Sequence, residues 1–271
     1  MDSVFAQTAA DFEVIIVDDH SAGDEVAALV GEHNDGRLRS LKVTGRGGAA
    51  TARNIGIGGA TADYIAFLDD DDEWLPGKLA AQLGVMARCD RTTGGVYTAR
   101  LTVDRLNGRT TTERFQARFQ PGVTDNVITT SSVLLRRECF ERVGFFDEDL
   151  AVGSDYDMWI RIGREYAFHY LDEVLVKYYV HMENLSHDYQ RQRDSFVQLL
   201  DKHAELFAHH PPFLARQYAI LGAMCLRDRI FAGALSAFWK GMRSAPLEWR
   251  TYARAFRGFA RTFVHAVHRS G

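Results

Sequence analysis

Two groups of aspartates stand directly after apolar runs in this sequence. The stretch "EVIIVDDHS" (13–21) contains Asp18 and Asp19, and "YIAFLDDDDEW" (64–74) contains four successive aspartates at 69–72. Carboxylates repel one another and resist burial, so such a cluster at the end of a buried strand needs a compensating charge. Mg²⁺ and Mn²⁺ prefer carboxylate oxygens and are commonly shared between one or two carboxylates and the phosphates of a substrate. The pattern therefore favours a site for a divalent cation and a nucleotide diphosphate.

Two other interpretations of the acidic runs are open. "IIVDDH" and "FLDDDDEWLPG" resemble the strands of a phosphoacceptor receiver domain, but that fold needs a lysine after a later strand. No lysine lies between Lys78 and Lys177, which argues against it. A solvated acidic turn without a ligand is the simpler alternative, because runs of like charge are often merely hydrated.

The elements that would position these aspartates follow from the hydrophobic pattern. Residues 14–17 and 64–68 are short, continuous apolar runs, typical of strands buried on both faces of a mostly parallel sheet. Residues 25–32 and 49–60 suit helices, so the order predicts right-handed crossovers and an open, doubly wound sheet. Ligands bind at the carboxyl ends of the strands in such sheets, which is where both acidic groups fall.

The second half of the chain predicts further strands and then only helices. We expect a helix from 75 to about 87, and strand-like segments at 94–103, 112–119 and 129–137. A helix that stops at Gly144 follows, and another helix begins at Ser154 and Asp155, residue types that favour helix N-termini. Strands at 167–171 and 174–181 complete this part. The pattern is helical from about residue 184.

Several ordered blocks resemble the family 2 inverting glycosyltransferases of the GT-A fold. The blocks are "FEVIIVDDHS", "ATARNIGIGGATADYIAFLDDDDEWLPGKL", "TTSSVLLRRECFERVGFFDEDLAVGSDYDMWIRI" and "VLVKYYVHMENLS", and the resemblance covers roughly residues 3–186. It implies an α/β fold with a Rossmann-like mixed, mostly parallel sheet flanked by helices. The expected division is a glycosyltransferase domain at 1–183 and a helical C-terminal extension at 184–271.

The resemblance also implies how a nucleotide-sugar donor is held. Asp19 would accept a hydrogen bond from the imide N–H of uracil, and Arg53 and Asn54 would lie near the nucleotide. Asp69 would face the ribose, with Asp70 beside it as a further donor-binding residue. A purely structural role for the arginine is the alternative.

The same resemblance implies a metal site and a general base. Asp71 would bind Mg²⁺ or Mn²⁺, and His181 would complete the metal or diphosphate site. Asp155 would be the base that deprotonates the acceptor hydroxyl, although helix capping alone would also explain an aspartate there. The family more often has Glu where this chain has Ser154, and Asp157 suits the helix dipole better than catalysis.

The implied function is metal-dependent, inverting transfer of a sugar from a nucleotide diphosphate, expected to be UDP, to an acceptor hydroxyl. The acceptor would be a glycan or a lipid-linked sugar, and no nucleic-acid partner is expected. Two alternatives stay open. One is an inactive, truncated relative or a non-catalytic nucleotide-sugar binder. The other is a nucleotidyltransferase, which would carry a Gly-rich loop with Lys or Arg after its first strand; the missing first strand keeps this alternative open.

The start of the chain departs from the family pattern. Family members open with a strand that is central in the sheet, whereas this chain begins at the following helix, "DSVFAQTAADF". Two neighbouring strands would then expose unpaired edges. Either the true start lies upstream or the chain is a truncated copy, and the intact metal and base positions favour the first interpretation.

The charge distribution separates the C-terminal part from the rest. From Pro211 onward ten Arg or Lys stand against two acids, a net charge of +8, so residues 1–210 carry −12 of the total of −4. Aromatic residues from Trp249 to Phe263 recur at three- and four-residue steps beside a row of arginines. This predicts a basic amphipathic helix, which either packs on the protein or rests on an anionic membrane. With no apolar run long enough for a span and no basic start of a signal peptide, we expect a cytoplasmic protein, peripheral at the inner face of the membrane.

Overall fold

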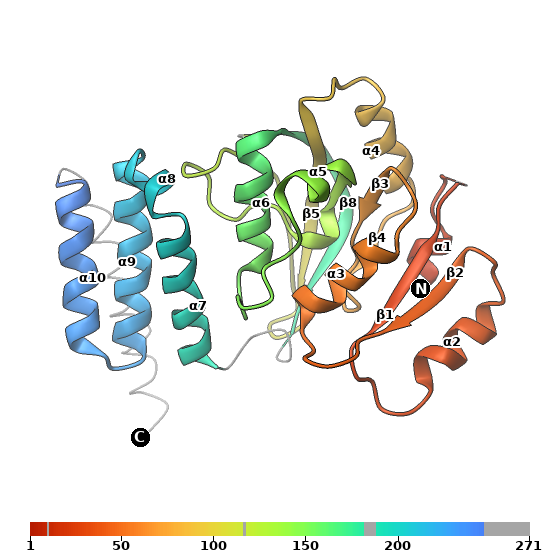
Figure 1. The fold of residues 1–271 in the computed structure, drawn as a ribbon, viewed down its shortest axis with the longest axis horizontal. Helices are drawn as coiled ribbons and strands as arrows, with labels where there is room; N and C mark the ends of the chain where they lie inside the picture. Colours follow the sequence, from red (N-terminus) through yellow and green to blue (C-terminus); the bar gives the residue numbers. More distant parts are fainter. Residues whose placement is uncertain (10, 116–117, 182–187, 247–271) are drawn as a thin grey trace. The chain divides into compact units, whose positions relative to one another are not determined.

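The computed structural model describes residues 1–9, 11–115, 118–181 and 188–246. The chain divides into two compact units, each described by itself (Figure 1). The first comprises Met1–Asp149 and Ser154–Leu185, and the second comprises Leu150–Gly153 together with the helices that follow the first unit. The first unit holds all the strands among the described residues.

The first unit begins with a small βαβ arrangement. Its elements are α1 (Asp2–Phe5), β1 (Val14–Asp18), α2 (Glu25–His33), β2 (Leu38–Lys42) and α3 (Ala49–Gly59). β1 and β2 pair in parallel over their whole length, from Val14 opposite Leu38 to Asp18 opposite Lys42. The order of strand, helix and strand confirms the expected crossover, with β2 as its second strand.

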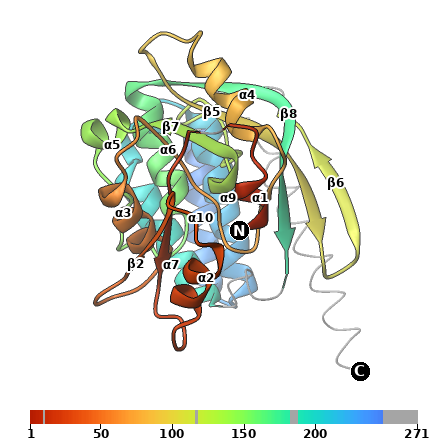
Figure 2. The ribbon, with the colours of Figure 1, turned by 90° about the vertical axis from the view of Figure 1, so that its right-hand side faces the viewer.

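The larger sheet of this unit is mixed. Its strands are β3 (Tyr64–Ala66), β4 (Glu73–Trp74), β5 (Thr93–Asp104), β6 (Arg109–Glu113), β7 (Val133–Arg136) and β8 (Ala167–Val180). Their order is β3-β7-β5-β8-β4, and β6 pairs with β5. Figure 2 shows β6 along the outer edge of the sheet. The longest ladder, β5 with β8, is parallel, whereas β3, β4, β6 and β7 pair antiparallel with their neighbours. The sheet is thus of the α/β type expected from the sequence.

Helices cover both faces of the β5–β8 ladder. The helices are α4 (Lys78–Met86), α5 (Glu138–Val143) and α6 (Ser154–Glu165), with a 3₁₀ turn, η1 (Thr130–Ser132), before β7. Val96 of β5 packs against α4, in a cluster that includes Leu79 and Met86. The next residue, Tyr97, points to the other face, because side chains alternate along a strand. There it packs edge-on against Phe168, which in turn contacts the fully buried Trp159 of α6.

Two expectations for this region need correction. The strands expected at 167–171 and 174–181 are one continuous strand, β8, which absorbs the interruption through register shifts opposite Thr98 to Arg100. The segment expected at 112–119 contributes to a strand only as far as Glu113, where β6 ends. Polar residues in 171–173 suggested a turn, but pairing with β5 along most of β8 holds the chain extended.

β1 and β3 belong to separate sheets. Among the described strands β1 pairs with β2 alone, and β3 pairs with β7 alone. The apolar residues Val14 to Val17 of β1 are only half-buried. Among the described strands, the unpaired edges that the sequence led us to expect are therefore present.

The second unit is helical. Its helices are α7 (Tyr189–Lys202), α8 (Ala204–Ala208), α9 (Pro211–Arg227) and α10 (Phe231–Ser244). The ring of Phe238 on α10 occupies the space beside Gly222 of α9, where a Cβ would lie 2.4 Å from the ring. Of the helices that the structure describes, none combines the length and apolar character needed to cross a membrane. The amphipathic helix expected at 249–267 lies outside the described residues.

Lys78, the first residue of α4, is a charged group in the core of the first unit. Its side chain is completely buried, its Nζ has no hydrogen-bond partner, and its nearest compensation is the ring of Trp74, 4.2 Å from Nζ to the centroid. Burial lowers the pKa of Lys78 to about 7 from an ordinary value of 10.5. The folded state therefore favours the neutral amine, whereas the unfolded chain keeps the proton up to a higher pH.

Lys78→Met should stabilise the protein at neutral pH. Between about pH 7 and 10.5 the unfolded wild-type chain binds a proton that the folded chain lacks, so wild-type stability should rise by up to about 1.4 kcal/mol per pH unit from this group. Unfolding in guanidinium chloride at pH 7 and pH 9 measures the effect. Lys78→Met should lose that rise, and Lys42→Met, whose side chain is 62% exposed, should keep it. Equal slopes in all three proteins would contradict the prediction.

Candidate functional site

The acidic turn after β3 is anchored on η1. The backbone N–H of Asp69 donates to the hydroxyl of Ser131 at 3.1 Å, and the N–H of Asp72 donates to the carbonyl of Asp69 at 3.1 Å. The indole of Trp74 donates to the carbonyl of Ser131 at 2.8 Å. Because Ser131 is fully buried, these bonds fix where the chain turns and which way each aspartate points.

Asp69 is paired with Arg53 of α3. The guanidinium donates to the Asp69 carboxylate at 2.7 Å, and the side chain of Arg53 is only 16% exposed. Its guanidinium carbon lies 5.7 Å from the ring centroid of Phe146, so the arginine is held between a carboxylate and an aromatic face. The sequence placed both residues near the nucleotide, and the structure brings them into direct contact.

Asp71 lies against His181, which follows β8. One carboxylate oxygen of Asp71 and Nε2 of His181 are 3.0 Å apart, and both side chains are about one-fifth exposed. The pair joins residues 110 positions apart in the sequence. A carboxylate and an imidazole nitrogen are both ligands that a divalent transition-metal ion such as Mn²⁺ accepts.

The donor set fits a metal shared with a substrate rather than one enclosed by protein. In residues 1–246, outside the gaps given above, no three His, Cys, Asp or Glu side chains gather with the spacing of a complete metal site. Asp71 and His181 would supply two ligands at a partly exposed position. The remaining positions would be left to phosphate oxygens and water, as is usual for Mg²⁺ at nucleotide sites.

Asp72 differs from its neighbours because it is buried. It is 6% exposed, one carboxylate oxygen accepts from the N–H of Tyr179 at 3.1 Å, and the other has no partner. Burial, with a smaller contribution from the charges of Asp71 and Asp69, raises the pKa of Asp72 to about 6. Asp70, by contrast, is exposed to solvent. Four consecutive aspartates thus occupy four different environments.

Asp19 is held by the glycine-rich loop before α3. Its carboxylate accepts from the N–H of Gly48 at 2.7 Å, and a Cβ on Gly47 would lie 2.2 Å from the other carboxylate oxygen. Gly48 itself has a φ of 137°, which side-chain-bearing residues rarely adopt. The glycines therefore let the loop close over Asp19. The adjacent Asp18 is buried and accepts from the N–H of Ser21, which lowers its pKa.

Asn54 is engaged with the loop after α5. Its side-chain amide donates to the carbonyl of Phe146 at 2.9 Å and accepts from the N–H of the same residue at 2.8 Å. It also donates to Glu148 at 2.8 Å. These bonds saturate the amide, so Asn54 positions the loop that carries Phe146 beside Arg53.

Asp155 stands in the first turn of α6 and is half-buried. Its carboxylate accepts from the side-chain amide of Asn126 at 3.0 Å and from the N–H of Tyr156 at 2.8 Å. Asp157, two residues on, is fully buried and forms an ion pair with Arg161 at 2.9 Å. Arg161 in turn donates to the carbonyls of Val143 and Phe145. Asp157 therefore stabilises the glycine-containing loop at Gly144, and Asp155 keeps an accessible carboxylate.

Two pairs of the predicted residues are in direct contact, Arg53 with Asp69 and Asp71 with His181. The hydrogen bonds of Asp19, Asn54 and Asp155 described above go to other residues, namely Gly48, Phe146 with Glu148, and Asn126 with Tyr156. Sequence analysis missed Ser131, Asn126 and Glu148. Ser131 and Glu148 both lie within the block that begins with "TTSS", whereas Asn126 lies in a loop without a recognisable pattern.

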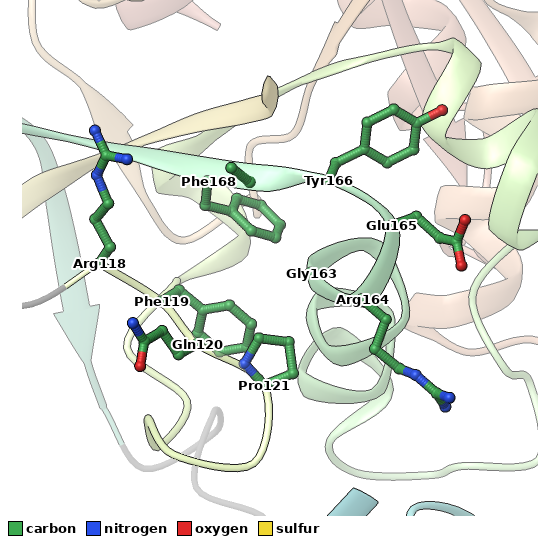
Figure 3. A pocket seen from close by; sticks show the side chains of 10 residues that line it. Arg118, Phe119, Gln120, Pro121, Gly163, Arg164, Glu165, Tyr166 and Phe168 are labelled. Carbon is green, nitrogen blue, oxygen red and sulfur yellow. The ribbon is translucent and has the colours of Figure 1, made fainter. Parts of the chain in front are cut away.

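A separate cavity lies at the far end of α6 (Figure 3). It has a volume of about 370 Å³ and lies between the loop at Phe119 to Pro121 and the end of α6 at Gly163 to Tyr166. Phe168 forms its inner wall, and Arg118 and Arg164 lie at its rim. With a rise of about 1.5 Å per residue, Gly163 is roughly 12 Å along the helix from Asp155. None of the predicted site residues lines this cavity.

Comparison with known proteins gives the family. The profile of the family described as "Glycosyl transferase family 2" matches residues 1–144. The uncharacterized glycosyltransferase RP339 of Rickettsia prowazekii is 26% identical over 207 residues, which cover 73% of this chain and 64% of the relative. The succinoglycan biosynthesis protein ExoO of Rhizobium meliloti is 34% identical over 172 residues, covering 58% of this chain and 48% of ExoO.

A third relative has a more specific description. It is the Escherichia coli protein WfgD, described as UDP-Glc:alpha-D-GlcNAc-diphosphoundecaprenol beta-1,3-glucosyltransferase, 40% identical over 86 residues, or 32% of this chain and 34% of WfgD. The chain spans less than two thirds of the length of each of these relatives.

Solved structures show the same fold. The crystal structure of residues 1–349 of TarS from S. aureus has a TM-score of 0.62 at 16% identity, covering 96% of this chain and 86% of that one. A structure of the same TarS fragment in complex with UDP has a TM-score of 0.57 at 14% identity, covering 91% and 86%. The ordered sequence blocks, the matching profile over residues 1–144 and the GT-A-like architecture together make this chain a member of glycosyltransferase family 2.

Proposed function

We propose that this glycosyltransferase carries out metal-dependent, inverting transfer of a sugar from a UDP-sugar to an acceptor hydroxyl. The observation that carries the proposal is the contact between Asp71 and His181, with Arg53 on Asp69 two residues away. A carboxylate and an imidazole held together at the end of a sheet form an incomplete set of metal ligands. The phosphate oxygens of a nucleotide diphosphate complete such a set. An acidic turn that is only hydrated would not need a histidine held beside its aspartate.

The protein groups have separate tasks in this reaction. Asp19 binds the uracil, and Asp69, held by Arg53, faces the ribose with Asp70 beside it. Asp71 and His181 would hold Mg²⁺ or Mn²⁺, and the bound ion would supply Lewis-acid neutralisation of the negative charge on the diphosphate. Asn54 acts on the donor side indirectly, because its amide fixes the loop that places Phe146 against Arg53.

Asp155 serves as the general base. It takes the proton of the acceptor hydroxyl while the hydroxyl oxygen bonds to the anomeric carbon, and the bond from that carbon to the phosphate oxygen breaks on the opposite face. The electron pair of that bond leaves with the diphosphate, so the configuration inverts without a covalent sugar-enzyme intermediate. Asn126 holds the Asp155 carboxylate in one orientation through its 3.0 Å hydrogen bond.

We propose a lipid-linked sugar or a growing polysaccharide as the acceptor. ExoO is described by succinoglycan biosynthesis and WfgD by a diphosphoundecaprenol-linked acceptor, and both are similar to part of this chain. Such an acceptor would place the enzyme in the cytoplasm at the inner face of the membrane. The basic residues from 250 to 269 would contribute attraction to anionic lipids there.

Asp71→Asn should weaken metal-dependent binding of UDP. Because the amide loses the negative charge that holds the cation, we expect affinity in the presence of Mn²⁺ to fall about tenfold or more, ~1.4 kcal/mol. Binding without metal should change little. Isothermal titration calorimetry with and without Mn²⁺ measures both, with Asp201→Asn, an exposed position on α7, as the control. Equal Mn²⁺ dependence in both variants would rule out Asp71 as a metal ligand.

Asp155→Asn should abolish most turnover and leave donor binding intact. Loss of a general base costs about 10²- to 10⁴-fold in rate. The assay follows radiolabelled sugar from UDP-glucose into a lipid fraction that contains GlcNAc-diphospho-lipid, with UDP calorimetry in parallel. Asp149→Asn, exposed and on a nearby loop, is the matched control and should retain activity. Metal-dependent UDP binding without turnover by the wild type on any acceptor would favour the non-catalytic binder instead.

A further inference from the structure

One face of α10 carries large apolar side chains in solvent. Leu235 is 71% exposed, Phe231 63%, Trp239 60% and Met242 43%. Their spacing of four, four and three residues places them in one stripe along the helix, named here the α10 stripe. Single exposed apolar residues are ordinary on protein surfaces, but four large ones in one row mark an interaction surface.

The α10 stripe is not the face by which the helix joins its own unit. α10 packs on α9 through small residues, Ala234, Ala237 and Gly241, which are almost fully buried. Phe238, at the edge of this face, fits beside Gly222 of α9. The helix therefore has one apolar face that is used within the unit and a second that is not covered by the described residues.

The charges around the stripe have one sign. Between Asp228 and Glu248 the sequence contains no acidic residue, but it contains Arg229, Lys240 and Arg243. Asp228 is itself paired with Arg193 and Arg227. α9, on which α10 packs, also has no Asp or Glu over Pro211–Arg227. An apolar row in an exclusively cationic setting matches an anionic surface better than it matches a second copy of itself, which would bring like charges together.

The composition also suits a lipid boundary. Trp is favoured where the apolar interior of a bilayer meets its headgroups, and Lys and Arg beside it can reach anionic phosphates while their stems remain in apolar surroundings. Helices that lie in the plane of a membrane combine such a row with flanking cations. α10 presents Trp239, with Met242 and Arg243 one turn on, whereas the ammonium of Lys240 lies over the ring of Tyr218 of α9.

We propose that the α10 stripe is a docking surface for an anionic lipid bilayer, with Phe231, Leu235 and Trp239 inserted and Arg243 at the phosphates. The stripe supplies the apolar part of membrane binding. The role of this surface in catalysis rests on the lipid-linked acceptor proposed above. Because the test measures binding to vesicles, the docking surface can be disproved while the glycosyltransferase activity is upheld. The activity can equally be disproved while the docking surface is upheld.

The first experiment is sedimentation of the 271-residue chain with sucrose-loaded vesicles. One set of vesicles is pure phosphatidylcholine, and the other contains about 30% of the anionic lipid phosphatidylglycerol. Wild type should bind the anionic vesicles and bind the neutral ones more weakly. Leu235→Ser with Trp239→Ser should weaken binding to anionic vesicles by about tenfold or more, from lost apolar burial. Val197→Ser, a similar change at an exposed position of α7, should have no effect. Equal binding by the double variant and wild type would overturn the proposal.

Arg243 and the depth of insertion provide two further readouts. Arg243→Gln should reduce binding to anionic vesicles by about fivefold. That reduction should largely disappear in 0.5 M salt, on the order of 3–4 times the physiological ionic strength. In a Trp249→Phe background, brominated lipid should quench Trp239 fluorescence, and Trp239→Phe should lose that quenching but still bind. Absence of quenching in protein bound to vesicles would overturn insertion of the stripe.

Self-association is the competing outcome. If the α10 stripe joined two copies of the chain, sedimentation velocity would show a dimer for wild type and a monomer for the Leu235→Ser, Trp239→Ser variant, with unchanged vesicle binding. That result would replace the lipid proposal. Circular dichroism and guanidinium unfolding of the variants check that the helices remain folded, as expected for substitutions at exposed positions.

Discussion

The site depends on keeping four successive carboxylates apart at the end of one short strand. Asp69 is paired with an arginine, Asp71 contacts a histidine, and Asp70 faces solvent. Asp72 accepts a hydrogen bond from a backbone N–H, and the pKa of its carboxyl is raised. The arginine comes from α3, and the histidine and the backbone N–H of Tyr179 come from the end of β8. Repulsion among the four carboxylates would destabilise the turn, and it is offset only in the arrangement in which these elements meet.

The rest of the first unit supports this arrangement. η1 fixes the turn through the buried Ser131, and the pairing of β4 with β8 keeps the following residues in register. Lys177 and Glu73 form an ion pair across the two strands at 2.8 Å. At α6, the ion pair of the buried Asp157 with Arg161 holds the loop at Gly144. Removing one partner of a buried ion pair costs far more stability than replacing both partners with apolar residues. These contacts therefore constrain the geometry even where they add little net stability.

The fold class and the position of the acidic residues after the strands could be predicted from the sequence, because both follow from local patterns. It did not predict what depends on distant contacts. Nothing near Lys78 marks it as buried, since a lysine at the start of a helix is usually solvated. β8 resembles two strands locally, and only its partner β5 makes it one. The α10 stripe was also missed, because periodicity identifies apolar faces but not which of two faces a neighbour covers.

The long β8 strand has a consequence for how the site can change. His181 is delivered by the end of a strand that is paired to β5 from its first residue to Val180 and to β4 near Glu73. A shift of one residue along this ladder would turn every side chain after it to the opposite face. An insertion or deletion of a single residue in the middle of β8 would therefore carry the histidine away from Asp71 while leaving every site residue in the sequence. An insertion of two residues would restore the facing of the later side chains but displace the histidine by about 6.6 Å along the strand. His181 would stay beside Asp71 only if a bulge absorbed the extra length, as the register shifts opposite Thr98 to Arg100 already do.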